Sequence, residues 1–396
     1  MRVLAITFDS ELKGGANRSF LSVVKGLRAC YGHEVDVVLP SDGALADALN
    51  VDSFDFEVED LPITGVVLKG EPKDCLRKLK ANLLAAKHYF RTVFVAASYK
   101  SENYDLVYIN GTSQLFGFFL AQRLDLPVVW HFRGYLTSQH YYRFKQTKMF
   151  NDPRNNIIVI SSSMLRQLPE SIGINPEIMT KVSNGLPLPG SREKQSVILG
   201  KKINCLQCGR IVETKGHLDA IQALSILKNK GIDGLRLHIV GEPTSPNSNY
   251  VNKLKETVME LGLEDSVQFH GQVDDMYSFR ESMDFELMCS VNEPFGRVTV
   301  EGMRSRLLVI GANTGGTLDI IEDGKTGLLY TQGDCKDLAN KMEWAISHEE
   351  EVQKIREKGA LFAWNHFTEK EMVAGVNAVM QRAKNEFTRR QQIGRE

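Results

Sequence analysis

Residues 203–230 read INCLQCGRIVETKGHLDAIQALSILKNK and combine a strand, a loop and a helix. The first six residues form an apolar, strand-like run that ends before Gly209. The helix predicted over 217–230 carries its apolar residues at helical spacing: Leu218, Ile221, Leu224 and Leu227. A strand that leads into a helix in this way is the repeating unit of α/β folds with parallel sheets.

The same alternation extends in both directions from this stretch. Before it we predict strands over 3–8, 34–39, 106–109, 128–131 and 157–161. After it we predict strands over 235–240, 267–270, 285–289 and 307–311, and a helical end from 335 to 396. Residues 187–202, with proline, glycine and mixed charge, indicate a linker. Two Rossmann-like halves joined by this linker would leave a ligand-binding cleft at the carboxyl ends of both sheets.

Composition limits the class of protein. A chain of 396 residues is long for a single core, which favours two domains. Its 42% hydrophobic and 24% charged residues are ordinary for a soluble globular protein. With 48 basic and 49 acidic residues the net charge is −1, so nothing in the overall charge favours binding to nucleic acid.

Cysteine usage and hydropathy favour a cytoplasmic protein. The six cysteines are sparse, and the pair Cys205-Leu-Gln-Cys208 lies in a predicted strand. A structural zinc site would need a second ligand pair at suitable spacing, and a redox pair should begin a helix. We therefore expect reduced thiols. No signal peptide and no run of ~18 to 20 apolar residues is found.

The loop after the strand 203–208 carries two cations, Arg210 and Lys215, and a helix begins beside Gly216. Helix N-termini favour anions, because their free N–H groups and the helix dipole both attract negative charge. Arginine and lysine beside such an N-terminus suit a diphosphate. A solvated loop is the alternative, since both residues are common in loops.

The stretch 292–303, NEPFGRVTVEGM, carries two carboxylates, Glu293 and Glu301. Eight residues span ~12 Å along a helix, whereas glycosidase acid/base pairs lie ~5 to 9.5 Å apart. We therefore expect two separate hydroxyl-binding roles. For Glu301 taken alone, a first-turn glutamate that complements the helix dipole is the alternative. The glycines of 311–316, GANTGG, follow the next strand and indicate either backbone amides near a ligand or an ordinary tight turn.

Taken together, these motifs resemble the retaining glycosyltransferases of family 4. Further stretches match the same family: Gly14-Gly15, Gly32-His-Glu-Val35, Val129-Trp-His131, Val182-Ser-Asn-Gly185, His238-Ile-Val-Gly241, Phe269-His-Gly271, Asp323-Gly-Lys-Thr-Gly-Leu328 and Phe362-Ala-Trp-Asn-His-Phe367. The resemblance covers nearly the whole chain. It implies the α/β fold called GT-B, with two Rossmann-like domains facing each other across a cleft. We expect an acceptor-binding domain over 1–188, a nucleotide-sugar-binding domain over 189–370, and a final helix over 371–396 that packs back on the first domain.

The resemblance also assigns roles. Arg210 and Lys215 would bind the donor diphosphate and stabilise the departing nucleoside diphosphate by fixed positive charge. Glu301 would hold the ribose hydroxyls, and Glu293 would contact hydroxyls of the transferred sugar. His131 would lie beside that sugar from the N-terminal domain. In this family the departing phosphate itself is thought to take the acceptor proton, so no protein base is required.

The remaining donor-binding positions implied by the family are mostly backbone sites. Gly15 would face the diphosphate, and the amides of Phe295 and Gly296 would lie near the sugar. The set is completed by Gly14, Gly241, Arg297 and Val298. No strict Asp-x-Asp occurs, so we expect no metal and no cofactor beyond the nucleotide-sugar substrate; Asp55-Phe-Glu57 and Asp284-Phe-Glu286 come closest.

This sequence departs from the family pattern after Met303. The family usually has small residues, a glycine and a proline there, whereas this chain has Arg304-Ser-Arg-Leu-Leu308. After the two glycines, the acidic residue that is usual in the family is shortened to an aspartate, Asp319. Arg297 is often apolar in the family, and it either faces an unusual donor group or lies in solvent. The donor sugar therefore cannot be named from these residues.

Two basic segments, 73–91 and 133–148, bear on the acceptor. In the first, Leu76, Leu79, Leu83, Phe90 and Val93 share one helical face, with Arg77, Lys80, Lys87 and Arg91 alongside. The second contains Arg133, Tyr135, Tyr141, Tyr142, Arg143, Lys145 and Lys148. Such surfaces can make a peripheral contact with anionic lipid on the inner face of the plasma membrane, or receive a phosphate-linked acceptor. The commoner alternative is a helix packed on a sheet with a solvated outer face.

The predicted function is transfer of a sugar from a nucleotide sugar to a glycan or lipid-linked glycan, in the synthesis of a cell-surface polysaccharide or glycolipid. One alternative is a nucleotide-sugar epimerase of the same fold, which would recruit Glu293 and His131 as acid and base. Another is a non-catalytic nucleotide-binding subunit, which should have lost Arg210, Lys215 or Glu293. A nicotinamide dehydrogenase is disfavoured, because no Gly-x-Gly-x-x-Gly follows a predicted strand.

Overall fold

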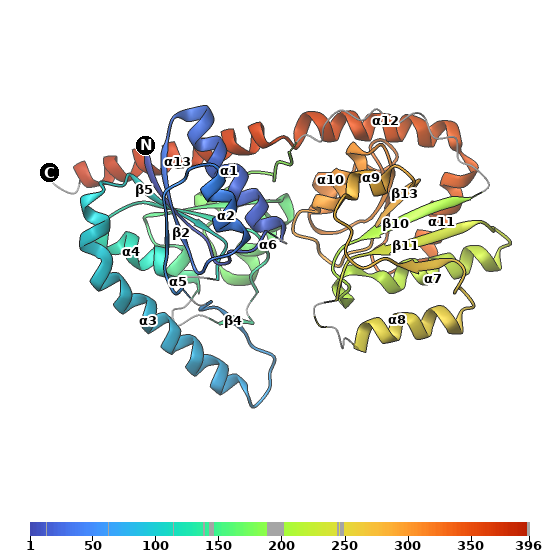
Figure 1. Ribbon diagram of the computed structural model, residues 1–396, viewed down its shortest axis with the longest axis horizontal. Coiled ribbons are helices and arrows are strands. Elements are labelled where there is room, and N and C mark those ends of the chain that lie inside the picture. Colours follow the sequence, from blue (N-terminus) through green and yellow to red (C-terminus); the bar gives the residue numbers. More distant parts are fainter. Residues whose placement is uncertain are drawn as a thin grey trace. The chain divides into compact units, whose positions relative to one another are not determined.

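The structure is a computed structural model (Figure 1). It describes residues 1–393 except 13, 62, 114, 138, 142–145, 188–201, 244 and 246–248. The chain divides into two compact units, described separately below. The first unit contains Met1–Leu186 and Thr368–Glu396, and the second contains Pro187–Phe367.

The first unit is built on a parallel sheet. Within the described residues the sheet has seven strands, in the spatial order β3 (Phe56–Val58), β2 (Glu34–Leu39), β1 (Arg2–Ile6), β5 (Leu106–Asn110), β6 (Val128–Phe132), β8 (Asn155–Val159) and β9 (Met179–Lys181). A separate antiparallel pair joins β4 (Val66–Val67) to β7 (His140–Tyr141). The helices of this unit are α1 (Gly15–Tyr31), α2 (Ala44–Val51), α3 (Asp74–Ser101), α4 (Phe116–Leu124), α5 (Gln146–Phe150), α6 (Ser162–Ile172), the 3-10 helix η1 (Pro176–Ile178) and α13 (Glu369–Ile393).

Alternate residues of each strand face opposite layers of helices. Val3 and Ala5 of β1 share a core with Phe20 of α1 and Val376 of α13. Ile6, on the other face, lies against α4, where a Cβ on Gly117 would come within 2.9 Å of it. Because both faces are covered, the central strands are apolar at nearly every position, as expected for a parallel sheet.

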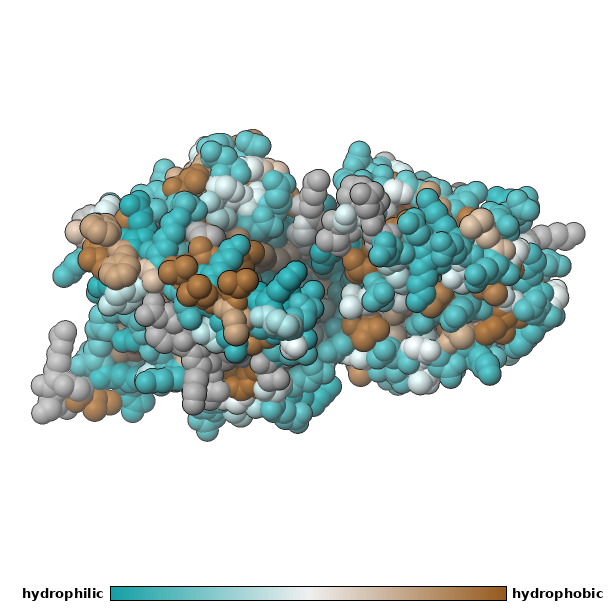
Figure 2. All heavy atoms as spheres, turned by 90° about the horizontal axis from the view of Figure 1, so that it is seen from below, coloured by the Kyte–Doolittle hydropathy of each residue, from teal (hydrophilic) through white to brown (hydrophobic). Residues whose placement is uncertain are grey.

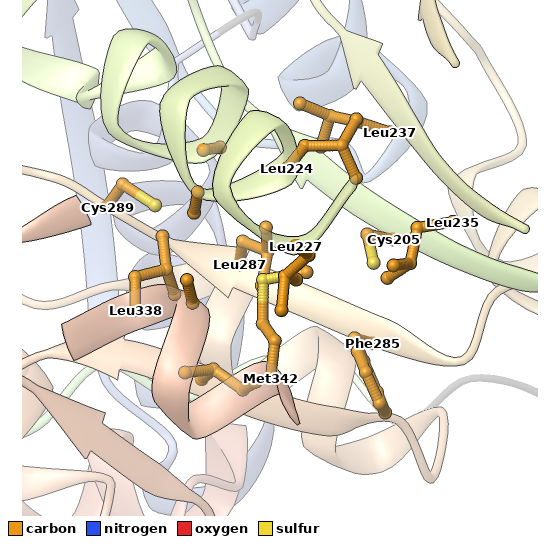
Figure 3. Close-up of a cluster of buried hydrophobic side chains, with 14 of the residues drawn as sticks. Cys205, Leu224, Leu227, Leu235, Leu237, Phe285, Leu287, Cys289, Leu338 and Met342 are labelled. Atoms are coloured by element: carbon orange, nitrogen blue, oxygen red, sulfur yellow. The ribbon is translucent and has the colours of Figure 1, made fainter. Parts of the chain in front are cut away.

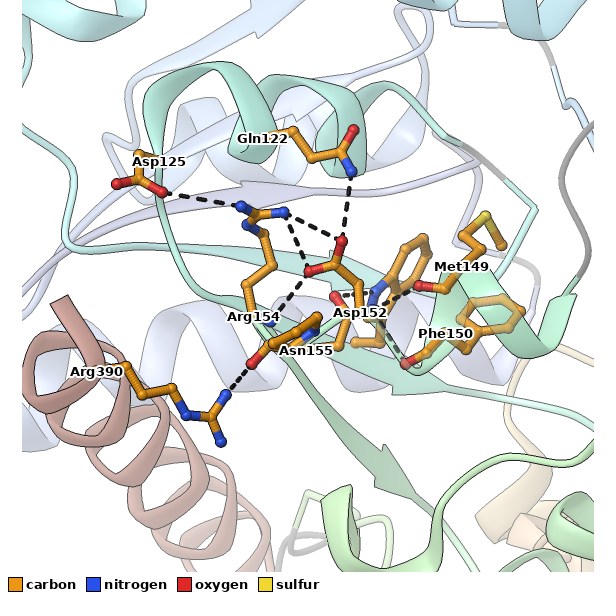
Figure 4. Close-up of polar contacts among 10 residues, drawn as sticks. Gln122, Asp125, Met149, Phe150, Asp152, Arg154, Asn155 and Arg390 are labelled. Atoms are coloured by element: carbon orange, nitrogen blue, oxygen red, sulfur yellow. Dashed lines mark hydrogen bonds and ion pairs between the residues drawn. The ribbon is translucent and has the colours of Figure 1, made fainter. Parts of the chain in front are cut away.

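Helix α13 belongs to the first unit although it ends the chain, which confirms the predicted return of the C-terminal helix. Gly26 of α1 lies so close to Val373 that a Cβ there would come within 2.5 Å. Gln391 donates to Asp125 over 2.8 Å, and Arg390 donates to the carbonyl of Pro153. Figure 4 shows Arg390 reaching the segment that also carries Asp152, Arg154 and Asn155.

The second unit repeats the architecture. Its sheet has six parallel strands among the described residues, in the order β12 (Val267–Phe269), β11 (Leu235–Val240), β10 (Ile203–Cys208), β13 (Phe285–Met288), β14 (Leu308–Ala312) and β15 (Leu328–Tyr330). Its helices are α7 (His217–Asn229), α8 (Asn249–Glu260), α9 (Met276–Arg280), α10 (Arg297–Arg304), α11 (Cys335–Ser347) and α12 (Glu349–His366), with the 3-10 helices η2 (Glu213–Lys215) and η3 (Gly315–Asp319). The expected pair of Rossmann-like halves is confirmed.

The core of the second unit lies between its sheet and the helices α7 and α11. Figure 3 shows apolar side chains from these helices meeting those of the central strands, among them Leu227, Leu287, Leu338 and Met342. The same core contains Cys205 and Cys289, and burial raises the pKa of both thiols. Cys205 and Cys208 both lie in β10, a strand, as predicted from the sequence. The core holds the carboxyl ends of β10, β13 and β14 in place.

Helix α3 does not pack as the alternative of a sheet-packed helix expected. Apart from Tyr99, which is buried against Phe116, the buried residues of α3 are small or polar. Ala81, Ala85, His88 and Thr92 are buried, whereas Leu76, Leu79 and Leu83 are exposed. The alternative of a sheet-packed apolar face is therefore wrong for this helix.

Candidate active site

In the second unit, loops far apart in the sequence meet at the carboxyl end of the sheet. Gly216 follows the loop after β10, and a Cβ there would come within 2.1 Å of the carbonyl oxygen of Cys289, just after β13. The amide of Val291 donates to the carbonyl of Thr214 over 2.8 Å. The loop after β10 is thus packed directly against the loop after β13.

The two glycines after β14 have a steric role. A Cβ on Gly315 would come within 2.4 Å of the carbonyl oxygen of Glu293, and one on Gly316 within 2.6 Å of the Cα of Phe295. The Gly316 amide donates to the Glu293 carbonyl over 2.6 Å. The sequence left open whether these glycines approach a ligand or form a turn. They let a third loop press against the turn that begins at Glu293.

This packing brings Lys215 and Glu293 together. The Nζ of Lys215 lies 2.5 Å from Oε2 of Glu293, and their side chains are 26% and 17% exposed. Gln207 of β10 donates to the carbonyl of Lys215 over 2.8 Å, which fixes the backbone beneath the pair. A charge-assisted hydrogen bond in a half-buried place holds both side chains firmly. Arg210, on the same loop, is exposed.

Gly241 supports the loop that carries Arg210. Its φ is 142°, and a Cβ would come within 1.9 Å of the carbonyl oxygen of Gly209. The amide of Ile211 donates to Glu242 over 2.9 Å. The loops after β10 and β11 therefore lie in direct backbone contact, which requires glycine at 241.

Glu301 is held by a residue that the sequence analysis did not find. Arg280, fully buried at the end of α9, donates to Oε2 of Glu301 over 3.1 Å. It also donates to both carboxylate oxygens of Glu286, over 2.8 and 2.9 Å. Burial alone would lower the pKa of Arg280, but the charges of Glu286 and Glu301 outweigh it and raise that pKa. Arg280 therefore stays charged and fixes the direction of the Glu301 carboxylate.

Helix α10 separates the two glutamates. Gly296, with a φ of 99°, is its N-cap, and Arg297 and Val298 form its half-buried first turn. Phe295 is buried against Phe367. Glu301 is the fifth residue of α10, and that helix has no acidic residue in its first turn. The alternative that Glu301 complements the helix dipole from the first turn is therefore wrong.

The departure from the family pattern after Met303 has a structural explanation. Arg304 is buried, and it donates to the carbonyls of Pro187 and Phe367 over 2.9 Å each and of Ala363 over 3.4 Å. Its guanidinium lies 5.5 Å from the centre of the Trp364 ring. Arg304 thus joins the end of α12 to the start of this unit, which is a structural role.

In the first unit, His131 lies at the end of β6 and is fully buried. Its Nδ1 is 2.8 Å from the hydroxyl of Tyr108, while no described residue bonds its Nε2. Burial lowers the pKa of His131 well below its usual value, and the charge of Arg133 adds to this effect. The ring is therefore neutral at pH 7.

The tautomer of His131 follows from its neighbours. Arg133 donates from Nη2 to the Tyr108 oxygen over 3.4 Å, so that oxygen accepts and its own hydrogen is free to point at His131. Nδ1 of His131 then accepts, and the proton of the neutral ring is assigned to Nε2. Burial raises the pKa of Tyr108 to about 12, which keeps its hydroxyl protonated.

A network of amides extends this site and was not predicted from the sequence. Arg133 donates to Asn110 over 2.7 Å and to Asn184 over 2.8 Å. Asn110 donates to Asn17, which in turn donates to the carbonyls of Asp9 and Glu11 over 2.8 and 2.9 Å. These bonds hold the loop that leads to Gly14 and Gly15 at the start of α1. The Val182-Ser-Asn-Gly185 motif could have indicated one member of this network, because Asn184 lies within it.

Gly14 itself is exposed, and no atom lies within 4 Å of the place where its Cβ would be. Its φ of −92° is accessible to any residue. The surrounding protein therefore does not require glycine at 14. Gly15 is the first residue of α1, which has neither a side-chain cap nor an acidic residue in its first turn.

Part of the second basic segment lies outside the described residues, namely Tyr142, Arg143 and Lys145. Arg133 belongs to the amide network described above. Among the described residues, no group of three or more His, Cys, Asp or Glu side chains could hold a metal ion.

Comparison with known families matches both units. The profile described as "Glycosyltransferase Family 4" matches residues 13–188, and the one described as "Glycosyl transferases group 1" matches residues 191–362. The chain belongs to the family 4, group 1 glycosyltransferases. The resemblance inferred from the motifs is confirmed.

Two curated relatives illustrate the range of the family. The capsular polysaccharide biosynthesis glycosyltransferase CapM of Staphylococcus aureus is 29% identical over 177 residues, which cover 44% of this chain and 45% of CapM. The mannosylfructose-phosphate synthase of Agrobacterium fabrum is 31% identical over 169 residues, covering 40% of this chain and 37% of that enzyme. The aligned region thus spans less than half the length of either relative.

The fold is matched over nearly the whole chain. The crystal structure of HepE from Anabaena in complex with UDP has a TM-score of 0.75 to this structure at 22% sequence identity. The match covers 96% of this chain and 100% of HepE. This family 4 glycosyltransferase therefore has the GT-B fold, as the resemblance implied.

Proposed function

We propose that this family 4 glycosyltransferase is a retaining enzyme that transfers a sugar from a nucleotide sugar to a glycan or a lipid-linked glycan. The observation that carries the proposal is the ion pair between Lys215 and Glu293, held beside the N-terminus of α10. A cation that meets a phosphate and a carboxylate that meets sugar hydroxyls must be neighbours, because these groups are neighbours in the donor. The solved complexes of HepE with UDP and with UDP-glucose support a donor of this class.

Each side chain has a stated task in this reaction. The bond between the anomeric carbon and the diphosphate oxygen breaks, and the acceptor oxygen forms a new bond to that carbon on the same face. The acceptor proton passes to the departing phosphate. Lys215 and Arg210 offset the negative charge that grows on the diphosphate, so the proposal needs no metal ion. Glu293 orients the sugar through its hydroxyls.

Glu301 and His131 complete the donor contacts. Glu301, aimed by Arg280, would accept the two ribose hydroxyls. The Nε2 proton of neutral His131 would be donated to a hydroxyl of the sugar, which is consistent with a buried Nε2 that no described residue bonds. At Gly14 and Gly15 the backbone amides would approach the diphosphate, which accounts for a glycine that the surrounding protein does not require.

The acceptor is proposed from the relatives. The names of CapM and of the lipopolysaccharide core biosynthesis glycosyltransferase LpsE of Rhizobium meliloti support an acceptor in cell-surface polysaccharide. The name of mannosylfructose-phosphate synthase points instead to a phosphorylated small sugar. Once the donor is identified, measuring sugar transfer to each class of acceptor would decide between them.

The test is a thermal-shift screen against nucleoside diphosphates and their sugars. A true donor at a hundred times its Kd should stabilise the protein by about 2.7 kcal/mol. Lys215→Ala should abolish the shift. Lys230→Ala is the matched control, because Lys230 makes a similar 2.5 Å pair with Glu343 on the exposed surface. If no nucleoside diphosphate raises the Tm, the proposed function is wrong.

A second measurement separates transfer from epimerisation. A transferase releases free nucleoside diphosphate only when an acceptor is present, whereas an epimerase converts the nucleotide sugar without one. Release that depends on the acceptor supports the proposal, and conversion of the donor alone would show the epimerase instead.

A further inference from the structure

Helix α3 of the first unit turns its large apolar side chains towards solvent. Leu76, Leu83 and Phe94 are 68%, 63% and 78% exposed. Together with their neighbours they form one stripe along the helix, which we call the α3 stripe: Leu76, Leu79, Leu83, Phe90, Val93 and Phe94. Figure 2 views the molecule from below relative to Figure 1, and hydrophobic side chains gather on that face of the first unit.

The α3 stripe is exposed because the opposite face of the helix is already packed against α4. The inner face of α3 packs on α4, where the rings of Tyr89 and Tyr99 meet those of Phe119 and Phe116. Arg123 of α4 donates to the hydroxyl of Thr92 over 2.8 Å, and its guanidinium lies 4.6 Å from the centre of the Tyr89 ring. Because the inner face is fixed by these contacts, the leucines and phenylalanines on the opposite face must remain outside. Soluble proteins rarely expose a continuous apolar surface unless it binds a partner.

The charge of α3 indicates which partner. The helix contains six basic residues, Arg77, Lys78, Lys80, Lys87, Arg91 and Lys100, and one acidic residue, Asp74. The whole chain by contrast has a net charge of −1. Lys80 and Lys87 follow the stripe along one side at a spacing of seven residues, so they share a face of the helix.

Three of these cations are partly offset by acidic neighbours. Arg77 pairs with Asp74 over 2.5 Å and with Glu71 over 3.0 Å. Arg91 forms a bidentate pair with Glu59 over 2.8 and 2.9 Å, and Lys87 pairs with Asp60. The Lys87 pair is exposed on both sides, and such pairs are weak in water. Lys78 and Lys80 lie exposed near the N-terminal end of the stripe. Positive charge therefore remains along this edge.

The dimensions fit a helix that lies flat on a bilayer. From Leu76 to Phe94 the stripe runs ~27 Å along the helix axis. No helix among the described residues combines the length and the apolarity needed to cross a membrane. An amphipathic helix with an apolar face and a basic border binds in the interface plane, where its apolar side chains enter the headgroup region and its cations meet anionic lipids.

We propose that the α3 stripe docks this protein on an anionic membrane surface. A second copy of the chain is a poorer occupant, since pairing two such helices would bring the basic edges of both close together with no acidic row to meet them. The inference stands independently of the proposed glycosyl transfer, because it concerns other residues and a different ligand.

The test is co-sedimentation of the full chain with vesicles of phosphatidylglycerol and phosphatidylcholine in equal parts, compared with phosphatidylcholine alone. Binding is expected to the anionic vesicles and should weaken as salt is raised. The double variant Leu83→Ser/Phe90→Ser should bind at least about tenfold more weakly. Both side chains are exposed, so the variant should fold, which circular dichroism checks. Leu361→Ser/Met259→Ser is the matched control, because both residues are exposed apolar residues of the second unit.

A charge variant tests the lipid headgroup separately. Lys80→Glu should weaken binding to anionic vesicles by at least about fivefold, whereas Lys255→Glu, at an exposed position of α8, should leave it unchanged. Equal binding to both vesicle types would overturn the proposal. So would failure to sediment with anionic vesicles, or a dimer in solution that Leu83→Ser/Phe90→Ser separates while the wild type binds no vesicle.

Discussion

The two units share one architecture but build their candidate sites from opposite kinds of group. In the second unit each proposed functional glutamate has a cation beside it, Lys215 for Glu293 and Arg280 for Glu301. In the first unit, His131 is kept neutral among a phenol, amides and one arginine. The difference shows how the same sheet edge can serve two purposes. Fixed charges suit a diphosphate donor, whereas a neutral hydrogen-bond donor suits an uncharged sugar hydroxyl.

The largest effect should come from breaking the buried charge cluster of the second unit. Arg280→Ala leaves the buried carboxylate of Glu286 without its charge partner, and we expect a loss of about 3–5 kcal/mol in the free energy of unfolding. Denaturant titration would measure it. Lys325→Ala, which removes an ion pair with Glu322 that is exposed on both sides, should cost about 1 kcal/mol or less.

A double variant sharpens the same point. Arg280→Met/Glu286→Leu should recover most of the lost stability, because buried ion pairs are often replaceable by apolar residues. It should nevertheless bind the donor more weakly than wild type, since Glu301 loses its orienting partner. Full donor affinity in this double variant would contradict the role given to Arg280.

The next effect separates the two glutamates. Glu301→Gln should weaken binding of the nucleoside diphosphate and of its sugar to the same extent, by about 1.5–3 kcal/mol, because both contain the ribose. Glu293→Gln should weaken only the nucleotide sugar. Isothermal titration with both ligands measures the difference. If Glu293→Gln weakened the binding of both ligands equally, then Glu293 would not contact the transferred sugar.

The neutral site of the first unit should appear in the pH dependence of stability. The folded-state pKa of His131 lies below the ordinary value of about 6.5, so below that pH the unfolded state binds a proton that the folded state does not. This contribution to stability is present above about pH 6.5 and is lost as the pH falls. As the pH is lowered from 6.5 to 5, the free energy of unfolding should therefore fall by about 2 kcal/mol less in His131→Gln than in wild type.

His217 provides the comparison in the second unit, because burial lowers its pKa to about 4. His217→Gln should reduce the acid sensitivity to a similar degree, but without changing sugar transfer. If His131→Gln keeps the pH dependence of the wild type, then His131 is charged in the folded protein and the proposed donor role of Nε2 needs another basis.

The smallest effect concerns the ends of helices. In the first unit, α1 and α6 are followed by Gly32 and Gly173 with φ of 63° and 68°. After α10 the equivalent conformation is held by Arg306, with a φ of 56°. Arg306→Gly should stabilise the protein by about 0.5–1 kcal/mol, because glycine adopts this conformation without strain. Arg306→Ala is the control and should bring no gain in Tm.

The sequence predicted the regular elements well, because parallel strands buried on both faces leave an unmistakable apolar run. The bounds predicted for β2, β10 and β11 are those of the structure. The strand predicted over 285–289 ends one residue earlier in the structure, at Met288. Such differences arise at ends, where a loop from elsewhere decides the last hydrogen bonds.

The site was only partly predictable. Lys215 and Glu293 were found because their motifs are local, and the structure brings them into contact. Arg280 and Asn17 were not found, because each acts on a residue distant in the fold and neither stands in a recognisable motif. The direction in which the apolar face of α3 points could not be predicted from the periodicity of its residues either. Its apolar stripe is visible in the sequence, but nothing in the sequence says whether that stripe faces in or out.

The place of α13 has a consequence for synthesis on the ribosome. Domains usually fold in the order in which they are made. Here the core of the first unit includes Met372, Val376 and Met380, which are translated after the whole of the second unit. The N-terminal unit therefore lacks one wall until translation is nearly complete, and we expect the second unit to be the first to reach its finished structure. A nascent chain that stalls before residue 368 would carry a complete half and an open one.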